Sequence, residues 1–229
     1  MFPQIAARNQ PASGRTARNV TSPTRLIASG ADADSLAQRI AFMGATMAYA
    51  RNTEIFGENE PADSLYNVVK GTVRTYKVLN DGRHQIGGFY LPGDIFGLEL
   101  ADAYALSADT ITDAKVLVVT RRALAALAER DAAIGRELHA LTARELRRIQ
   151  ERILLLIKSA QERVPSFLLE MTERTATADT IELLMSRQDI ADYLGLTIEA
   201  VSRTLSALES APPSKCRPRG GLCCATVRR

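Results

Sequence analysis

The chain has 229 residues, of which 46% are hydrophobic and 24% are charged, a composition typical of one or two globular domains. It holds no apolar run long enough to cross a membrane and no signal-peptide pattern, so we expect a cytoplasmic protein. The formal net charge of +3 hides an acidic body between basic ends at residues 1–31 and 212–229, so charge alone does not indicate nucleic-acid binding.

Short strands dominate the first half of the chain. Residues 1–31 are rich in Pro, Ser, Thr, Gly and Arg without periodicity, which predicts a disordered tail, although an acid-free start also fits a transit peptide. Residues 33–43 suit a short helix. Strands are then predicted over residues 65–70, 72–79, 86–91, 95–97 and 116–120. Turns at Asn80–Gly82 and Pro92–Asp94 separate them, and this spacing is typical of an antiparallel barrel or sandwich, here residues 32–130.

Helices follow the strands. A short helix is predicted over residues 123–128 and a long one over about 132–162, before a break at Pro165. Apolar residues recur along the long helix at steps of three and four: Ile134, Leu138, Leu141, Leu146, Ile149, Ile153, Leu156 and Ile157. The opposite face is charged, with Arg144, Arg147, Arg148, Glu151 and Arg152. A helix this long extends beyond a small domain, so its apolar stripe is best covered by a second copy of the same helix. We therefore expect residues 131–161 to form a dimerisation helix. The alternative is a solvated helix that packs on its own domain.

A segment within residues 162–210 carries the pattern of a helix-turn-helix. Ser186 can cap a helix, with Asp189 as its reciprocal partner three residues later. Gly195 can take the left-handed conformation that ends this helix, and Thr197 can cap the next one. An ordinary amphipathic helical hairpin is the alternative, but this spacing of caps and small residues is more demanding than such a hairpin requires.

The second helix of this pair is predicted to have one polar and one apolar face. At about 100° per residue, Glu199, Ser202 and Arg203 share one side, whereas Val201 and Leu205 lie opposite. The apolar side can anchor the helix to its domain while the polar side enters the major groove of DNA. There an arginine can pair with guanine, and a glutamate can accept a hydrogen bond from cytosine.

These motifs, in this order, resemble the Crp/Fnr superfamily of bacterial transcription regulators. The run Ile198–Arg203 carries the Glu-x-x-Ser-Arg signature of the fumarate-nitrate type, and the segments Tyr193–Thr197 and Leu91–Glu99 are most similar to the FixK-like branch. The resemblance covers residues 35–208. It implies an α+β fold, in which an antiparallel β-roll similar to a cyclic-nucleotide-binding domain precedes a long dimerisation helix and a C-terminal helix-turn-helix of the winged-helix type.

The resemblance also implies how such a protein acts. Glu199, Ser202, Arg203 and Ile198 should contact a TTGA-type half-site, with a homodimer bound to a palindrome. The hairpin at Asn80–Arg83 matches a loop that contacts RNA polymerase in relatives. FixK-like proteins activate genes for low-oxygen respiration, denitrification and nitrogen fixation. We therefore expect a transcription activator and not an enzyme, since no catalytic constellation is arranged in the sequence.

The sensory domain departs from nucleotide-binding relatives. Those relatives place a Glu after the Gly of a Phe-Gly turn and then an Arg-Ser pair, whereas here Leu98 follows Gly97 and no arginine occurs between Arg83 and Arg121. We therefore expect that this domain binds no cyclic nucleotide, because no arginine is available to pair with the phosphate. All three cysteines lie in the last fourteen residues, and His84 is expected to be exposed, so neither an iron–sulfur cluster, a haem nor another metal or cofactor is predicted.

The C-terminal segment, residues 211–229, also differs from the corresponding segment of relatives. Relatives continue from the recognition helix into a two-stranded wing, but here Pro212-Pro213 and a basic, cysteine-containing tail follow. A missing wing, through a frameshift or a divergent terminus, keeps a second function open: a DNA-incompetent paralogue that acts by heterodimerisation. A third alternative, a nucleotide-regulated enzyme or ligand-binding module, would require a phosphate-binding arginine and a catalytic domain, which the sequence lacks.

Overall fold

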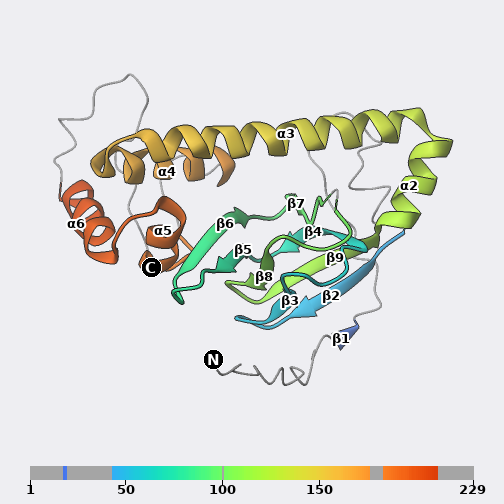
Figure 1. The fold of residues 1–229 in the computed structure, drawn as a ribbon, viewed down its shortest axis with the longest axis horizontal. Coiled ribbons are helices and arrows are strands. Elements are labelled where there is room, and N and C mark those ends of the chain that lie inside the picture. The colour runs from blue at the N-terminus through green and yellow to red at the C-terminus, as the bar shows by residue number, and fades with distance from the viewer. Residues whose placement is uncertain (1–17, 20–42, 100, 176–182, 211–229) are drawn as a thin grey trace, which may run out of the picture.

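The computed structural model describes residues 18–19, 43–99, 101–175 and 183–210 (Figure 1). The predictions for the N-terminal tail, the helix over residues 33–43 and the C-terminal tail therefore fall outside the described residues, apart from a two-residue strand at Arg18–Asn19. Within the described ranges, no helix is both long and apolar enough to cross a membrane.

Two antiparallel sheets form the predicted β-roll. Its strands are β1 (Arg18–Asn19), β2 (Ala45–Tyr49), β3 (Glu54–Phe56), β4 (Ser64–Lys70), β5 (Val73–Val78), β6 (His84–Tyr90), β7 (Ile95–Phe96), β8 (Ser107–Thr110) and β9 (Ala114–Thr120). One sheet has the order β1-β2-β9-β4-β7 and the other β3-β8-β5-β6, so β6 is an edge strand. The five strands predicted from the sequence are confirmed as β4, β5, β6, β7 and β9, while β1, β2, β3 and β8 were not predicted.

Aromatic rings fill the space between the two sheets. Phe56 lies 3.8 Å from Tyr104 and 5.1 Å from Tyr66, measured between ring centroids, and Phe96 stacks on Tyr66 at 5.1 Å. All four rings are buried. Aromatic side chains bury large apolar areas, so this cluster gives the roll its own core.

Five helices follow the roll in the described part of the chain. They are α2 (Arg121–Arg130), α3 (Ala132–Ile157), α4 (Ala160–Thr175), α5 (Arg187–Leu194) and α6 (Ile198–Glu209). Thr120 caps α2 and Asp131 caps α3, each with a side-chain oxygen that accepts from a backbone N–H of the first turn. Figure 1 shows α3 running along the roll from α2 at one end to α4, α5 and α6 at the other.

The long helix ends earlier than predicted, at Ile157. Lys158 has extended backbone angles, and Ser159 begins a new helix by hydrogen bonding through its N–H and hydroxyl to the Glu162 carboxylate, at 3.0 and 2.7 Å. The predicted break at Pro165 was wrong, because this residue lies inside α4. Its ring removes only the hydrogen bond to the carbonyl of Gln161, an exposed residue that water can reach.

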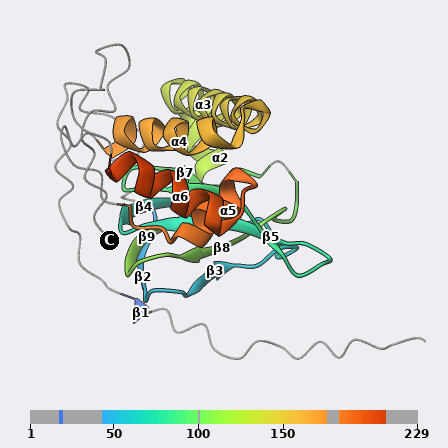
Figure 2. The same ribbon diagram turned by 90° about the vertical axis from the view of Figure 1, so that its left-hand side faces the viewer.

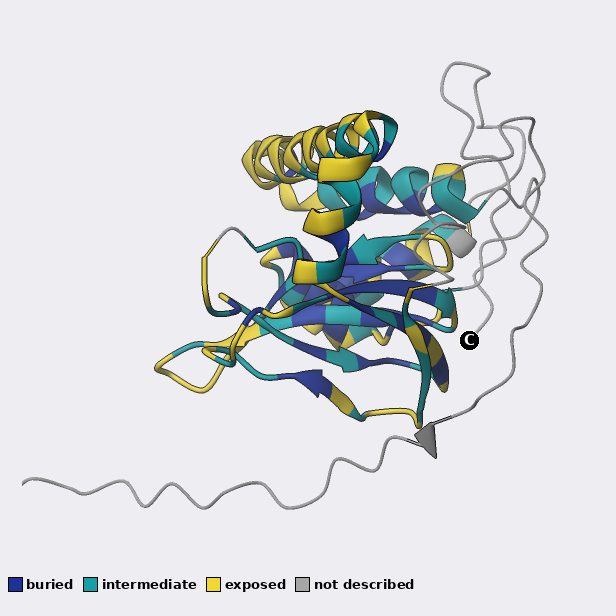
Figure 3. Cartoon of the chain, turned by 90° about the vertical axis from the view of Figure 1, so that its right-hand side faces the viewer, coloured by how far each residue is buried: buried dark blue, intermediate teal, exposed yellow. Residues whose placement is uncertain are grey.

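Two faces of α3 are apolar, rather than the single stripe that was predicted. Ile134 and Leu155 are buried, and Leu138 and Leu141 pack beside the roll core. On a neighbouring face Leu146, Ile149, Ile153 and Ile157 are exposed, and near the end of the helix Leu154 and Leu156 are exposed as well. Figure 3 shows this outer face of the helix largely as exposed.

Arg148 and Arg152 do not lie on the solvated face, as the sequence predicted, but on the face that contacts the roll. The guanidinium of Arg148 donates to the carbonyl of Phe89, and that of Arg152 donates to the carbonyls of Ile86 and Gly87. These carbonyls belong to β6, the edge strand of its sheet, which pairs on one side only among the described strands. The arginines therefore satisfy backbone groups that a neighbouring strand would otherwise serve.

Candidate DNA-recognition site

The caps predicted for the helix pair are present. The Ser186 hydroxyl accepts from the Asp189 N–H at 3.0 Å, and the Asp189 carboxylate accepts from the Ser186 N–H at 2.8 Å, which completes a capping box at the start of α5. Gly195 ends α5 in the left-handed conformation (φ 62°, ψ 43°), and the Thr197 hydroxyl accepts from Ala200 N–H at the start of α6. Local sequence therefore sets the geometry of the turn.

The apolar side of α6 anchors it to the neighbouring helices. Val201 and Leu205 are 0% and 1% exposed and join a core that includes Ile190 and Ala191 of α5. Ala191 is 0% exposed, and its small side chain leaves room for α6 to pack against α5. Figure 2, which views this end of the molecule, shows α6 at the surface beside α5.

The four predicted site residues lie together on the outward side of α6. Glu199 and Arg203 are exposed, Ser202 is partly exposed, and the Ile198 side chain is 38% exposed at the first position of the helix. The backbone N–H of Glu199 and the Thr197 hydroxyl hold the pKa of the Glu199 carboxyl below its usual value. Glu199 is therefore ionised at neutral pH and acts only as a hydrogen-bond acceptor.

Arg163 of α4 fixes the turn that follows α5, a role that was not predicted from the sequence. Its guanidinium donates to the carbonyl of Leu156 at 2.7 Å, to that of Lys158 at 3.0 Å and to that of Leu194 at 2.9 Å. One side chain thus links the end of α3 to the end of α5. No local pattern in the sequence indicates this role, because the carbonyls that Arg163 contacts come from two different helix ends.

The helix pair does not stand apart from the roll. Phe89 of β6 lies 5.2 Å from Tyr193 of α5 and 6.0 Å from Phe167 of α4, measured between ring centroids. Arg152 of α3 stacks its guanidinium over the Tyr193 ring at 4.7 Å. A continuous core therefore runs from the edge of the roll into α6. The sequence predicts residues 32–130 and 162–210 as separate domains, and no local pattern in it indicates this contact.

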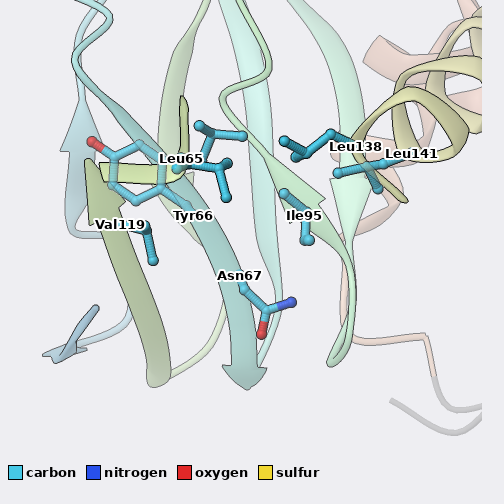
Figure 4. Close-up of a pocket in the computed structure, with 8 residues that line it drawn as sticks. Leu65, Tyr66, Asn67, Ile95, Val119, Leu138 and Leu141 are labelled. Atoms are coloured by element: carbon cyan, nitrogen blue, oxygen red, sulfur yellow. The ribbon is translucent and has the colours of Figure 1, made fainter. Parts of the chain in front are cut away.

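A hollow between the roll and the helices α2 and α3 is lined by aliphatic side chains, one tyrosine and one amide. Figure 4 shows Leu138 and Leu141 of α3 facing the roll residues of this lining. None of the described lining residues carries a charge, so none could pair with a cyclic phosphate. Arg121 instead donates to the backbone carbonyls of Ala62, Glu99 and Ala101. The absence of nucleotide binding stays a prediction.

His84 lies on the surface of the roll. It is exposed, as predicted, and its ring stacks on that of Tyr76 at 5.5 Å between centroids. Among the described residues, no group of three or more His, Cys, Asp or Glu side chains is placed to hold a metal ion.

Two family models match this chain. The cyclic nucleotide-binding domain matches residues 46–131, and the model for bacterial regulatory proteins of the crp family matches residues 183–211. A nitrogen fixation regulation protein FixK from Azorhizobium caulinodans is 48% identical over 179 residues, which are 76% of this chain and 72% of that one. The transcriptional activatory protein AadR of Rhodopseudomonas palustris is 42% identical over 166 residues, 70% of each chain.

The fold is also similar to a solved structure. The structure of FixK2 from Bradyrhizobium japonicum superposes with a TM-score of 0.71 at 47% identity, over 79% of this chain and 90% of that one. The order of roll, long helix and helix-turn-helix in this chain is therefore similar to that of a solved structure.

Proposed function

This chain belongs to the Crp/Fnr family of bacterial transcription regulators, which bind DNA and are not enzymes, and from that premise we propose that it recognises a palindromic TTGA-type site as a homodimer. The observation that carries the proposal is the outward face of α6, where Glu199, Ser202 and Arg203 lie together while Val201 and Leu205 anchor the opposite side. A helix held in this way can enter the major groove without unpacking.

The chemistry of these side chains fits such a half-site. A TTGA sequence contains one G·C pair, whose guanine offers two acceptors to Arg203 and whose cytosine offers one donor to Glu199. Ser202 can donate to or accept from a base edge. Ile198, with 38% of its side chain exposed, fits against a thymine methyl group. Each residue thereby has a complementary group within one half-site.

The names of the relatives suggest which genes it controls. Three curated relatives are named nitrogen fixation regulation proteins, and another is a transcriptional activatory protein. We infer that this chain activates nitrogen-fixation or low-oxygen genes in the bacterial cytoplasm. The exposed hairpin at Asn80–Arg83, tightened by the Asp81–Arg83 ion pair at 2.7 Å, would contact RNA polymerase.

We expect the full chain to bind a palindromic TTGA-type duplex about a thousandfold more tightly than a scrambled duplex of equal length. A gel-shift titration measures both affinities. It is done at one stated salt concentration, because salt weakens the attraction between the protein and the DNA phosphates. Equal affinity for the two duplexes would contradict sequence recognition. If the protein elutes as a dimer yet binds neither duplex, the alternative of a DNA-incompetent paralogue that forms heterodimers would replace the activator.

The exposed stripe of α3 supports the homodimer. Leu146, Ile149, Ile153 and Ile157 follow one another at steps of three and four residues and are each more than half exposed in the single chain. Such spacing is that of a coiled-coil seam, so a second copy of the same helix fits it. Residues 131–161 would then form the dimer contact.

Ile153→Glu should convert the protein to a monomer, because it places a charge in the apolar seam. Size-exclusion chromatography with light scattering measures the mass, and the gel shift should lose binding to the palindrome. Arg147→Glu is the matched control: this exposed residue lies about 120° around the same helix and should leave the dimer intact. A dimeric Ile153→Glu protein would contradict the proposed seam.

A further inference from the structure

Arg74 connects the roll to the helix-turn-helix. It lies on β5 directly opposite Asp109 of the paired strand β8. Its Nε and Nη2 atoms donate to the two oxygens of the Asp109 carboxylate at 2.7 and 2.9 Å. This two-point pairing fixes the plane of the guanidinium and leaves Nη1 directed away from β8.

The remaining nitrogen reaches the DNA-binding part of the chain. Arg74 Nη1 donates to Oδ1 of Asp189, which is 115 residues away and belongs to the first turn of α5. The other oxygen of Asp189 accepts from the N–H and the hydroxyl of Ser186, at 2.8 and 2.7 Å. The carboxylate that caps α5 is therefore also the group that binds the roll.

Burial makes this link strong. The Asp189 side chain is 11% exposed, that of Asp109 13% and that of Arg74 22%. Two poorly hydrated carboxylates thus share one guanidinium, and without it they would face each other with like charge. The carboxylates in turn raise the pKa of Arg74, which stays charged at any physiological pH.

A second contact lies beside the first. Gln85 of β6 donates from Nε2 to the backbone carbonyl of Asp192 in α5 at 2.7 Å. Both contacts join the β5–β6 hairpin to the same short helix, one at its start and one near its end. Two points define the direction of α5, and α6 is packed on α5.

We propose that Arg74 is a positioning residue for DNA recognition, which fixes the direction of α5 and α6 on the roll through the chain Asp109–Arg74–Asp189. The idea rests on the proposed DNA-binding function, because direction matters when two recognition helices must meet half-sites about 34–36 Å apart. A protein that lacked this link would still present Glu199 and Arg203 to one half-site. It would no longer hold the two recognition helices of the dimer at the spacing of the two half-sites.

The test compares Arg74→Met with Lys77→Met. Lys77 lies three residues away on the same strand β5 and pairs within the roll with Glu58 at 2.7 Å, with 47% of its side chain exposed, so it is a matched control. Affinity is measured for a palindrome, for the same palindrome with two base pairs inserted between its half-sites, and for a single half-site. Hydrogen–deuterium exchange of α5 is measured on the same proteins without DNA.

Arg74→Met should weaken palindrome binding by about 5- to 150-fold, the usual range of coupling between sites. It should reduce the preference for the natural spacing, leave half-site affinity within about twofold, and speed exchange in α5. Asp189→Asn retains an acceptor oxygen for the Ser186 N–H and should weaken palindrome binding in the same way. The double variant should be no worse than the more severe single one, since both remove one interaction.

Other outcomes would overturn the proposal. An equal loss on palindrome and half-site, with unchanged spacing preference, would make Arg74 a general stability residue. Exchange in α5 that matches that of Lys77→Met would show that Arg74 does not hold the helix. If the wild type binds no DNA, the proposed function fails, and the exchange measurement still decides whether Arg74 fixes α5. If Arg74→Met does not fold, Asp189→Asn supplies the same comparison.

Discussion

Replacing Phe167 with alanine is expected to lower the free energy of unfolding by about 3–5 kcal/mol. The Phe167 side chain is 0% exposed, and its ring lies 6.0 Å from that of Phe89 and 5.6 Å from that of Tyr193. The alanine variant loses apolar burial and leaves a cavity where α4, α5 and β6 meet. The free energy is obtained from urea unfolding followed by circular dichroism, at one fixed protein concentration because a dimer's stability depends on it.

The same substitution tests whether roll and helix pair share one core. Because Phe89 belongs to the roll and Tyr193 to α5, the Phe167→Ala protein should lose exchange protection in both β6 and α5. Val78→Ala, at a side chain that is 50% exposed on the hairpin, is the control and should change stability by no more than about 0.5 kcal/mol. Loss of protection in α5 alone would indicate that the two parts unfold independently.

Arg203→Ala should lower the discrimination between a palindrome and a scrambled duplex by about 2–6 kcal/mol while leaving the fold intact. A two-point contact between an arginine and a guanine contributes about 1–3 kcal/mol of discrimination, and a palindrome contains two such contacts. Arg203 is exposed, so its removal disturbs no packing. The gel shift on a palindrome and on a scrambled duplex gives the ratio of affinities for the variant and the wild type.

Arg122→Ala provides the comparison for Arg203→Ala. Arg122 is also exposed but lies in α2, at the far end of the molecule from α6 (Figure 1). Removal of one positive charge there should leave the ratio of affinities unchanged. If Arg203→Ala weakens binding to both duplexes by the same factor, Arg203 contacts phosphate rather than a base edge.

Local interactions explain why the helix-turn-helix could be predicted. The Ser186–Asp189 capping box, the left-handed Gly195 and the Thr197 cap each involve residues at most four positions apart, and all are present. The outward placement of Glu199, Ser202 and Arg203 followed from helical periodicity alone. Their contact with DNA stays a prediction, because no feature of the chain by itself shows what the exposed face binds.

Strands without an apolar pattern were missed. β8 reads Ser-Ala-Asp-Thr, and its inward residues are only Ala108 and Thr110. Thr110 is fully buried because its hydroxyl donates to the carbonyl of Ala50 at 2.6 Å, a partner 60 residues away. Periodicity identifies a strand only when its buried positions are apolar, so this one was not recognisable from the sequence.

The sequence by itself determined the order of roll, long helix and helix-turn-helix, because caps, turns and apolar periodicity act over a few residues. Only the tertiary structure decided where the charges of Arg74, Arg148 and Arg152 go. Sequence patterns assign arginine to solvent, yet these three are partly buried against partners 35 to 115 residues away. A guanidinium leaves water only where several fixed oxygens replace its hydration, and such a set of oxygens exists only once the edge of the roll and the helices have come together.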